Sequence, residues 1–309
     1  MSLPGPVLAI VGPTASGKSA LAELLACTLH SSVVSVDAMQ VYRGMDIGTA
    51  KVPEAERRCP LLMVDVADIG DEYSVKLFQQ DARRCVDALL DEGKVPILCG
   101  GTGLYLDAII DEMQFPAGSS GDERRSTYER LLERAGAQHL YELLVARDPE
   151  SAQLIHPNNT RRVIRALEML DEGSSYARHH EGLKKLAPHY EARIWGITCE
   201  RAALYQRIDR RVDEMFERGL VDEVERLRAR GLARTRTASQ AIGYKEVLAA
   251  LEGQTSMDEA RELVKRRTRN YAKRQLSWLR RDGRVRWVDA GDLEQAAREI
   301  LVDLAQATD

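Results

Sequence analysis

The first third of the chain alternates between short apolar runs and amphipathic stretches. Residues 7–11 are five apolar residues, three of them β-branched, and predict a buried strand that residues 19–26 follow as a helix. Residues 75–90 keep helical spacing between the capping residue Ser74 and Gly93. Further strands are expected at residues 33–36, 61–64 and 95–99. This alternation predicts an α/β fold, a parallel sheet with helices on both faces.

The pattern changes after residue 115. Residues 115–121 form a turn-rich linker, and residues 122–190 contain helical segments without a good strand. The clearest helix is residues 159–170, and residues 193–198 then predict a strand that returns to the sheet. We therefore expect a catalytic core made of residues 1–115 and 193–309, with an all-helical insertion domain at residues 116–192.

The C-terminal third is predicted to be helical, with residues 200–230 and 261–281 as its longest stretches. Within the second stretch, four cationic residues fall inside an arc of about 80° at 100° per residue. No acidic residue belongs to that row. A row of this kind indicates either a solvated helix face or a nucleic-acid contact, and sequence pattern alone leaves both open. The four residues are Lys265, Arg269, Lys273 and Arg280.

Charge is distributed unevenly along the 309 residues, whose net charge is −4. Residues 1–115 hold 9 Lys and Arg against 16 Asp and Glu, a net of −7. Residues 261–286 hold 11 Lys and Arg against two acids, a net of +9. One concentrated basic segment in an acidic protein indicates a local contact with a polyanion.

Composition narrows the protein class. Apolar content of 44% and charged content of 30% are typical of a soluble globular protein, and no apolar run reaches the roughly 20 residues that span a bilayer. The N-terminus lacks the features of a signal peptide, and the five cysteines are scattered without a C-x-x-C pair. We expect a cytoplasmic protein with reduced thiols and neither a zinc site nor a disulfide framework.

The stretch after the first strand has the pattern G-x-x-x-x-G-K-S. Between a strand and a helix, this pattern predicts a phosphate-binding loop whose backbone N–H groups turn toward the anion. Lys18 is expected to reach the outer phosphate and the Ser19 hydroxyl to take a Mg²⁺ position. The fold expected is therefore a P-loop NTPase-like sheet. The phosphate-binding residues are Gly12, Pro13, Thr14, Ala15, Ser16, Gly17, Lys18 and Ser19.

Polar residues follow several of the other predicted strands. Since ligands of parallel sheets bind at the carboxyl ends of the strands, Asp37, Asp65 and Thr102 are expected beside the phosphate loop. One carboxylate is a candidate to orient Mg²⁺ and the other to act as a general base. A base here would deprotonate either a hydroxyl, as in a kinase, or an amine that attacks carbon. Motif chemistry does not separate these two reactions, nor a non-enzymatic protein that binds RNA under nucleotide control.

Several segments, in order along the chain, resemble the tRNA isopentenyltransferase family of bacteria. The match runs from the first strand to about residue 280 and is specific because the segments occur together. They are the phosphate loop, Asp37-Ala-Met-Gln-Val-Tyr-Arg43, Gly48-Thr-Ala-Lys51, Gly100-Gly-Thr-Gly-Leu-Tyr105, His156-Pro-Asn-Asn-Thr-Arg-Arg-Val-Ile-Arg-Ala-Leu-Glu168, Gly243-Tyr-Lys-Glu246 and Lys273-Arg-Gln-Leu-Ser-Trp-Leu-Arg280.

The resemblance implies transfer of a dimethylallyl group from dimethylallyl diphosphate to N6 of adenosine 37 in the anticodon stem-loop of tRNA. It implies Asp37, Lys18 and Thr102 as catalytic residues, Mg²⁺ as cofactor, and an extruded base. The protein is expected to act as a monomer without an obligate protein partner. Residues implied to contact tRNA are Asp37, Ala38, Met39, Gln40, Arg43, Thr102, Arg124, Asn158, Asn159, Arg161, Arg162, Arg165, Gly243, Tyr244, Lys245, Lys265, Arg269 and Lys273.

Overall fold

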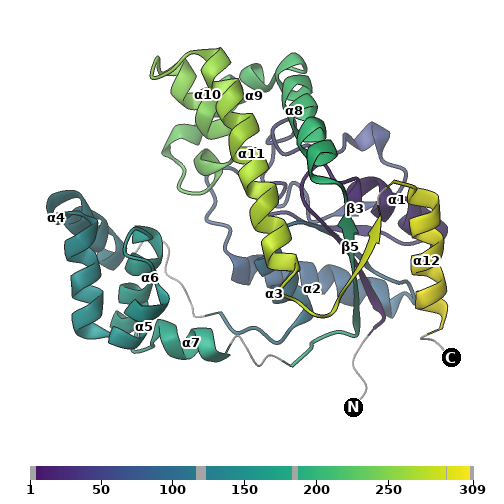
Figure 1. Cartoon of the computed structure of the whole chain (residues 1–309), viewed down its shortest axis with the longest axis horizontal. Helices are drawn as coiled ribbons and strands as arrows, with labels where there is room; N and C mark the ends of the chain where they lie inside the picture. Colours follow the sequence, from purple (N-terminus) through teal and green to yellow (C-terminus); the bar gives the residue numbers. More distant parts are fainter. Residues whose placement is uncertain (1–4, 116–122, 183–186, 290, 307–309) are drawn as a thin grey trace. The chain divides into compact units, whose positions relative to one another are not determined.

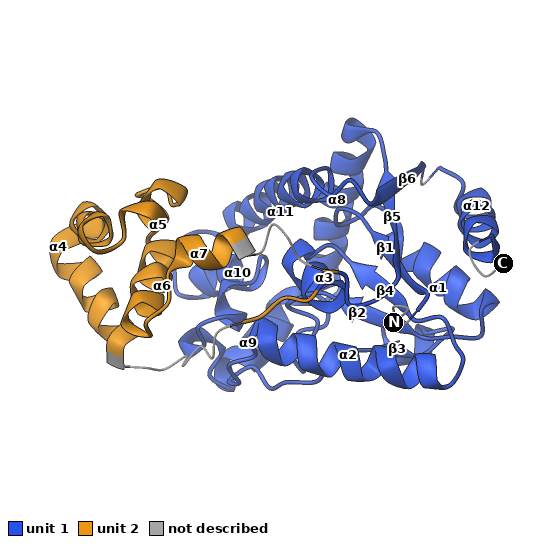
Figure 2. Ribbon diagram, turned by 90° about the horizontal axis from the view of Figure 1, so that it is seen from below, with its two compact units in different colours: residues 1–111, 188–309 blue, residues 112–187 orange. Residues whose placement is uncertain are grey.

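A computed structural model describes residues 5–115, 123–182, 187–289 and 291–306. The chain divides into two compact units, one made of residues 1–111 and 188–309 and the other of residues 112–187 (Figure 2). The second unit therefore occupies a slightly earlier segment than the insertion expected at 116–192. The linker expected at residues 115–121 lies almost entirely outside the described residues. In the described part of the chain, no helix is long and apolar enough to cross a membrane.

A six-stranded parallel sheet forms the centre of the first unit, in the order β3-β2-β4-β1-β5-β6 (Figure 1). The central strand β1 lies between β4 and β5, so the segments before and after the helical unit form one continuous sheet. The strands are β1 (Val7–Val11), β2 (Val33–Val36), β3 (Leu61–Leu62), β4 (Ile97–Gly100), β5 (Ala192–Thr198) and β6 (Val285–Asp289). The predicted α/β fold class is confirmed.

Alternating side chains of β1 enter two separate cores, as the two faces of a buried strand require. Val7, Ala9 and Val11 pack with helices of one face, whereas Leu8 and Ile10 pack with helices of the other. The second face is covered by α1 (Lys18–Thr28) and α12 (Leu293–Ala305). The core on the first face receives side chains from six helices: α2 (Val75–Asp91), α3 (Gly103–Ile110), α8 (Arg201–Glu217), α9 (Leu220–Ala229), α10 (Tyr244–Leu251) and α11 (Met257–Leu279).

Three local expectations differ from the structure. The strand expected at 61–64 is only Leu61–Leu62, because Met63 and Asp65 adopt left-handed backbone conformations with φ of +61° and +57°. The helix expected over 200–230 divides into α8 and α9 at Gly219, whose φ is +95°. Residues 285–289 form the edge strand β6 in a region expected to be helical throughout.

The second unit is helical, as expected for the middle of the chain. Asp148 and Asn159 cap α5 and α6 by accepting backbone N–H bonds from Ser151 and Arg162, respectively. Leu140, Leu144, Val163 and Leu167 belong to its own apolar core. The helices are α4 (Glu123–Arg147), α5 (Pro149–Leu154), α6 (Thr160–Asp171) and α7 (Tyr176–Gly182).

Candidate active site

The G-x-x-x-x-G-K-S segment forms a tight loop between β1 and α1. Gly17 adopts a φ of +96°, a conformation that favours glycine, and directly precedes the helix. A Cβ on Gly12 would lie 2.9 Å from the Ser16 hydroxyl oxygen, so the loop closes around that side chain. The Ser16 hydroxyl is buried and has no hydrogen-bond partner within the described residues. The loop thus offers an unsatisfied donor together with a helix N-terminus, which suits an anion.

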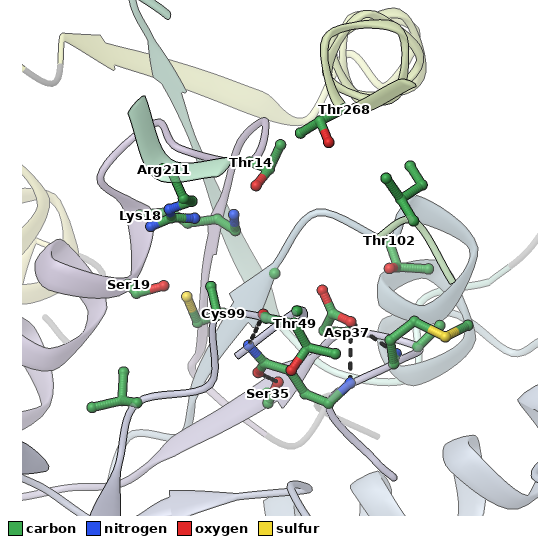
Figure 3. A pocket seen from close by; sticks show the side chains of 18 of the residues that line it. Thr14, Lys18, Ser19, Ser35, Asp37, Thr49, Cys99, Thr102, Arg211 and Thr268 are labelled. Carbon is green, nitrogen blue, oxygen red and sulfur yellow. Dashed lines mark hydrogen bonds between the residues drawn. The ribbon is translucent and has the colours of Figure 1, made fainter. Parts of the chain in front are cut away.

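A cavity of about 680 Å³ opens beside this loop, entirely within the first unit (Figure 3). It is lined by loops that follow β1, β2 and β4, and by one side each of α8 and α11. Lys18, Asp37 and Thr102 all line it, so three residues that are far apart in sequence share one site. Its apolar wall includes Val33, Val52, Leu61, Ile208, Val212, Met215 and Val264.

Two cations converge on the phosphate side of the cavity. Arg211 of α8 lies beside Lys18 in Figure 3. Burial lowers the pKa of Lys18, and the positive charge of Arg211 lowers it further, against raising contributions from Cys99 and Asp37. Burial also lowers the pKa of Arg211. Neither cation has an ion-pair partner in the part of the chain that the structure describes, although the Lys18 ammonium donates to the Pro13 carbonyl at 3.3 Å. Two half-buried cations without an ion-pair partner among the described residues are suited to bind a polyvalent anion.

Asp37 follows β2 and is oriented by its own loop. Its Oδ1 accepts backbone N–H bonds from Met39 at 2.8 Å and from Gln40 at 3.3 Å. No hydrogen bond to Oδ2 is made by any other described residue, so this oxygen is available to a ligand in the cavity. The arrangement fixes the side chain and leaves one carboxylate oxygen for proton transfer. Ala38 and Met39 line the same cavity.

Thr102 directly precedes α3, where it takes the N-cap position without a side-chain cap bond. Its hydroxyl oxygen is buried and has no partner of normal hydrogen-bond geometry in the described residues. The phenol of Tyr271, which also lines the cavity, lies nearby, and its pKa is raised by burial and by the charge of Asp37. The Thr102 hydroxyl therefore lies at the wall of the cavity beside Tyr271 with hydrogen-bonding capacity that is not fully used.

Asp65 does not belong to this site. Its carboxylate pairs with the buried Lys51 ammonium at 2.7 Å, and it lines a different surface depression. Lys51 also binds Asp46 at 2.6 Å. The left-handed backbone at Met63 and Asp65 ends β3 before the carboxylate reaches the rim of the sheet. The expectation that Asp65 acts beside the phosphate loop is wrong.

Gln40, expected to contact tRNA, is held within the protein. Its Oε1 accepts from the Ser35 hydroxyl at 2.8 Å, and its Nε2 donates to the Thr49 carbonyl at 3.1 Å. Its amide thus fixes the loop at residues 48–50, which lines the cavity together with Gln40 itself. Arg43 is exposed and lies 3.6 Å from Asp68.

The Gly243-Tyr-Lys-Glu246 segment also has a structural role. Tyr244 is fully buried and donates to Glu223 at 2.6 Å, so the expectation that it contacts tRNA is wrong. Gly243 is buried as well, whereas Lys245 is exposed and donates to Gln240. The Glu223 carboxylate also accepts three successive backbone N–H groups, those of Asp46, Ile47 and Gly48. Glu223 and Tyr244 therefore set the conformation of a loop in the cavity wall.

The basic row on α11 is partly neutralised by α8. Lys265 pairs with Asp213 at 2.8 Å and with Glu262 at 3.0 Å, and Arg269 pairs with Asp209. The expectation of a row without compensating acids is wrong, because two of its acids come from another helix and were not visible in the helix's own sequence. Lys273 is exposed and makes no ion pair with a described residue.

In the second unit, the residues implied to contact tRNA lie mostly on its surface. Arg161 and Arg162 are exposed, on the side of α6 away from the buried Val163 and Ile164. Arg165 is half-buried and lies 3.6 Å from Glu168. The remaining three are Arg124, whose guanidinium donates to the Asp171 carbonyl, the exposed Asn158, and Asn159, whose side chain caps α6.

Sequence reasoning missed Arg211, Thr268 and Gln275 as cavity residues. Arg211 lies at the inward-facing positions of α8, between Ile208 and Met215. The sequence signal that could have identified Arg211 is a charged residue on the apolar stripe of a helix. Gln275 similarly occupies the buried face of α11 and is only 5% exposed.

A family model described as IPP transferase matches residues 40–282. The chain belongs to this family. The resemblance to tRNA isopentenyltransferases is thereby confirmed, and curated relatives agree with it. The chain is 44% identical over 301 residues to the tRNA dimethylallyltransferase of Carboxydothermus hydrogenoformans, covering 96% of each. It is 46% identical to the tRNA dimethylallyltransferase of Streptomyces coelicolor, covering 92% of this chain and 90% of the relative.

Solved structures of the family have the same fold. The full-length tRNA isopentenylpyrophosphate transferase of Bacillus halodurans matches with a TM-score of 0.71 at 42% identity, covering 97% of this chain and 95% of that one. A eukaryotic dimethylallyltransferase acting on tRNA matches with a TM-score of 0.77 at 31% identity, covering 94% of this chain and 75% of that one.

Proposed function

We propose that this protein transfers a dimethylallyl group from dimethylallyl diphosphate to N6 of adenosine 37 in the anticodon stem-loop of tRNA. The observation that carries the proposal is the composition of one cavity. Lys18 and Arg211, which form no ion pair with a described residue, lie on one side of it. The Asp37 carboxylate lines it, and apolar side chains form part of its wall. The family relationship supports a prenyl donor and a tRNA acceptor as the substrates of this cavity.

The roles follow from where charge develops. The N6 amine forms a bond to C1 of the dimethylallyl group as the bond from C1 to the diphosphate oxygen breaks. Lys18, Arg211 and the loop N–H groups stabilise the negative charge of the leaving diphosphate. Asp37 accepts the proton that the amine loses, and Thr102 hydrogen-bonds the acceptor base. The products are N6-dimethylallyladenosine and diphosphate.

Mg²⁺ fits this cavity as a partner of the diphosphate. No cluster of three or more His, Cys, Asp or Glu side chains suited to a metal occurs in the described residues. Mg²⁺ bound to phosphates needs few protein ligands, and the Ser19 hydroxyl lines the cavity one residue after Lys18. When bound, the ion neutralises charge on the leaving group.

The acceptor tRNA is an anion much larger than the cavity, so it also contacts residues outside the cavity. Exposed Lys273 in the first unit, and Arg161 and Arg162 in the second, supply phosphate contacts without competing ion pairs among the described residues. We further propose that the enzyme acts in the cytoplasm, where tRNA is found, and that it acts as a monomer, since Lys18, Asp37 and Thr102 of the same chain line a single cavity.

One experiment tests the proposal. The protein is incubated with Mg²⁺ and unmodified tRNA, together with either labelled dimethylallyl diphosphate or γ-labelled ATP. We expect label to enter tRNA only from the prenyl donor, at adenosine 37. Transfer only from ATP would support a kinase instead, and binding of tRNA without either transfer would support a non-enzymatic RNA-binding protein.

A further inference from the structure

The side-chain amide of Gln275 joins two loops of the cavity. Its Oε1 accepts the backbone N–H of Thr14 in the phosphate loop at 2.9 Å. Its Nε2 donates to the backbone carbonyl of Gly101, next to Thr102, at 3.1 Å. One end of the amide thus holds the loop expected to bind diphosphate, and the other holds the loop that carries Thr102.

Gln275 is fixed in this position by its own helix. It is 5% exposed, and the neighbouring Ala272 is fully buried in a cluster that includes Ala15 of the phosphate loop. A Cβ added to Gly101 would lie 2.0 Å from the Gln275 Nε2, so the glycine allows the close approach. The amide therefore sits in a tight space with both of its polar atoms used.

We propose that Gln275 is a positioning residue that sets the distance between the phosphate loop and the loop that carries Thr102. Its bond to Thr14 fixes the N-terminal part of the phosphate loop, and its bond to Gly101 fixes the backbone that bears the Thr102 hydroxyl. In-line attack of an amine on carbon needs both reactants within about 3–3.5 Å, and a misplacement of about 1 Å costs on the order of 10²-fold in rate. The proposal rests on the transfer reaction proposed above.

The amide also gives α11 a connection to the site. Thr268, Tyr271 and Gln275 line the cavity from one face of this helix. Lys273 lies on another face, about 160° around the helix axis from Gln275 at 100° per residue. RNA bound at the Lys273 face would therefore contact the same helix that carries Gln275, whose amide holds both loops.

The test compares three variants with wild type. Gln275→Met keeps the length and the burial but removes both hydrogen bonds. Gly101→Ala retains Gln275 but displaces its amide, and its Cβ would also lie 2.9 Å from the Gly12 carbonyl oxygen of the phosphate loop. It serves as the second variant if Gln275→Met does not fold. Gln79→Met is the matched control, because Gln79 is also buried and donates at 2.8 Å to the Ala108 carbonyl, yet does not line the cavity. Each variant is measured for thermal stability, for transfer under single-turnover conditions, for tRNA Kd and for binding of Mg²⁺-pyrophosphate.

We expect Gln275→Met and Gly101→Ala to lower the single-turnover rate by about 10²-fold and to change tRNA Kd by less than about threefold. Binding of pyrophosphate should weaken by about tenfold, because the Thr14 N–H loses its acceptor and the phosphate loop is no longer held in place. Gln79→Met should lose stability with an unchanged rate per folded molecule. An unchanged rate in Gln275→Met, or an equal loss of rate in Gln79→Met, would overturn the proposal. Pyrophosphate binding does not require prenyl transfer, so a wild type without transfer activity refutes the proposed function separately.

Discussion

Arg211 lies beside Lys18 at the phosphate side of the cavity, and its charge contributes to lowering the pKa of the lysine. The two side chains come from α8 and from the start of α1, which lie far apart in the sequence. Two like charges held together inside a protein repel each other, and a bound polyvalent anion relieves that repulsion.

Replacing Arg211 should therefore weaken anion binding selectively. We expect Arg211→Gln to weaken Mg²⁺-pyrophosphate binding by about 10- to 100-fold, the loss associated with one hydrogen bond to a charged group. Calorimetric titration measures this. Arg210→Gln is the control, because Arg210 is 73% exposed and pairs loosely with Glu214 at 3.6 Å. Equal losses in the two variants would show that only the net charge of α8 matters.

Asp37→Asn should separate proton transfer from loop structure. The asparagine carbonyl oxygen keeps the acceptor for the Met39 and Gln40 N–H groups, so the loop after β2 is retained. Loss of a general base lowers the single-turnover rate by about 10²- to 10⁴-fold. Binding of tRNA, followed by filter retention, should remain close to wild type. A fall in tRNA affinity as large as the fall in rate would contradict the assignment of a base.

The basic row of α11 should contribute unequally to RNA binding. Lys273→Gln removes an exposed cation and should reduce the slope of log K against log salt for tRNA by about 1. Lys265→Gln should reduce it less, because this ammonium is already paired with Asp213 and Glu262. A slope that is identical in wild type and Lys273→Gln would identify the row as an ordinary solvated face.

Stability should depend on pH through Asp107. Burial raises the pKa of this carboxyl from 3.8 to about 7, with further increases from Asp111 and Asp282. Because the folded pKa is raised, the folded state binds more protons than the unfolded state between these values, and stability falls as pH rises from about 4 to about 7. Asp107→Asn should remove this decline and raise the free energy of unfolding at pH 8 by at most about 4 kcal/mol. Denaturant titrations at pH 5 and pH 8 measure it; parallel pH profiles for the two proteins would refute it.

Local pattern was sufficient to predict the strands β1 to β5 and the phosphate loop. Val7–Val11 is apolar at every position because both faces of the strand are buried, and the glycine loop follows it directly. The edge strand β6 escaped detection because only Val285 and Val288 are buried, while Arg286 and Asp289 are exposed. A strand this short forms because it pairs with β5, more than because of its own composition.

The site was only partly predictable for a similar reason. Motifs of adjacent residues identified Lys18, Asp37 and Thr102, which lie on loops at the ends of strands. Tyr244 was mistaken for a tRNA contact because a motif does not state whether its residues face solvent or the core. The acids that pair with Lys265 and Arg269 lie on α8, and only the packing of the two helices brings them together.

The hydrogen bond between Thr14 and Gln275 spans 261 positions of the chain. During synthesis the phosphate loop therefore leaves the ribosome long before the residue that holds it. A nascent chain that already contains the whole glycine motif, both cations and Asp37 still lacks that contact until α11 has emerged. The glycine motif appears at the start of translation, and its mature geometry only near the end.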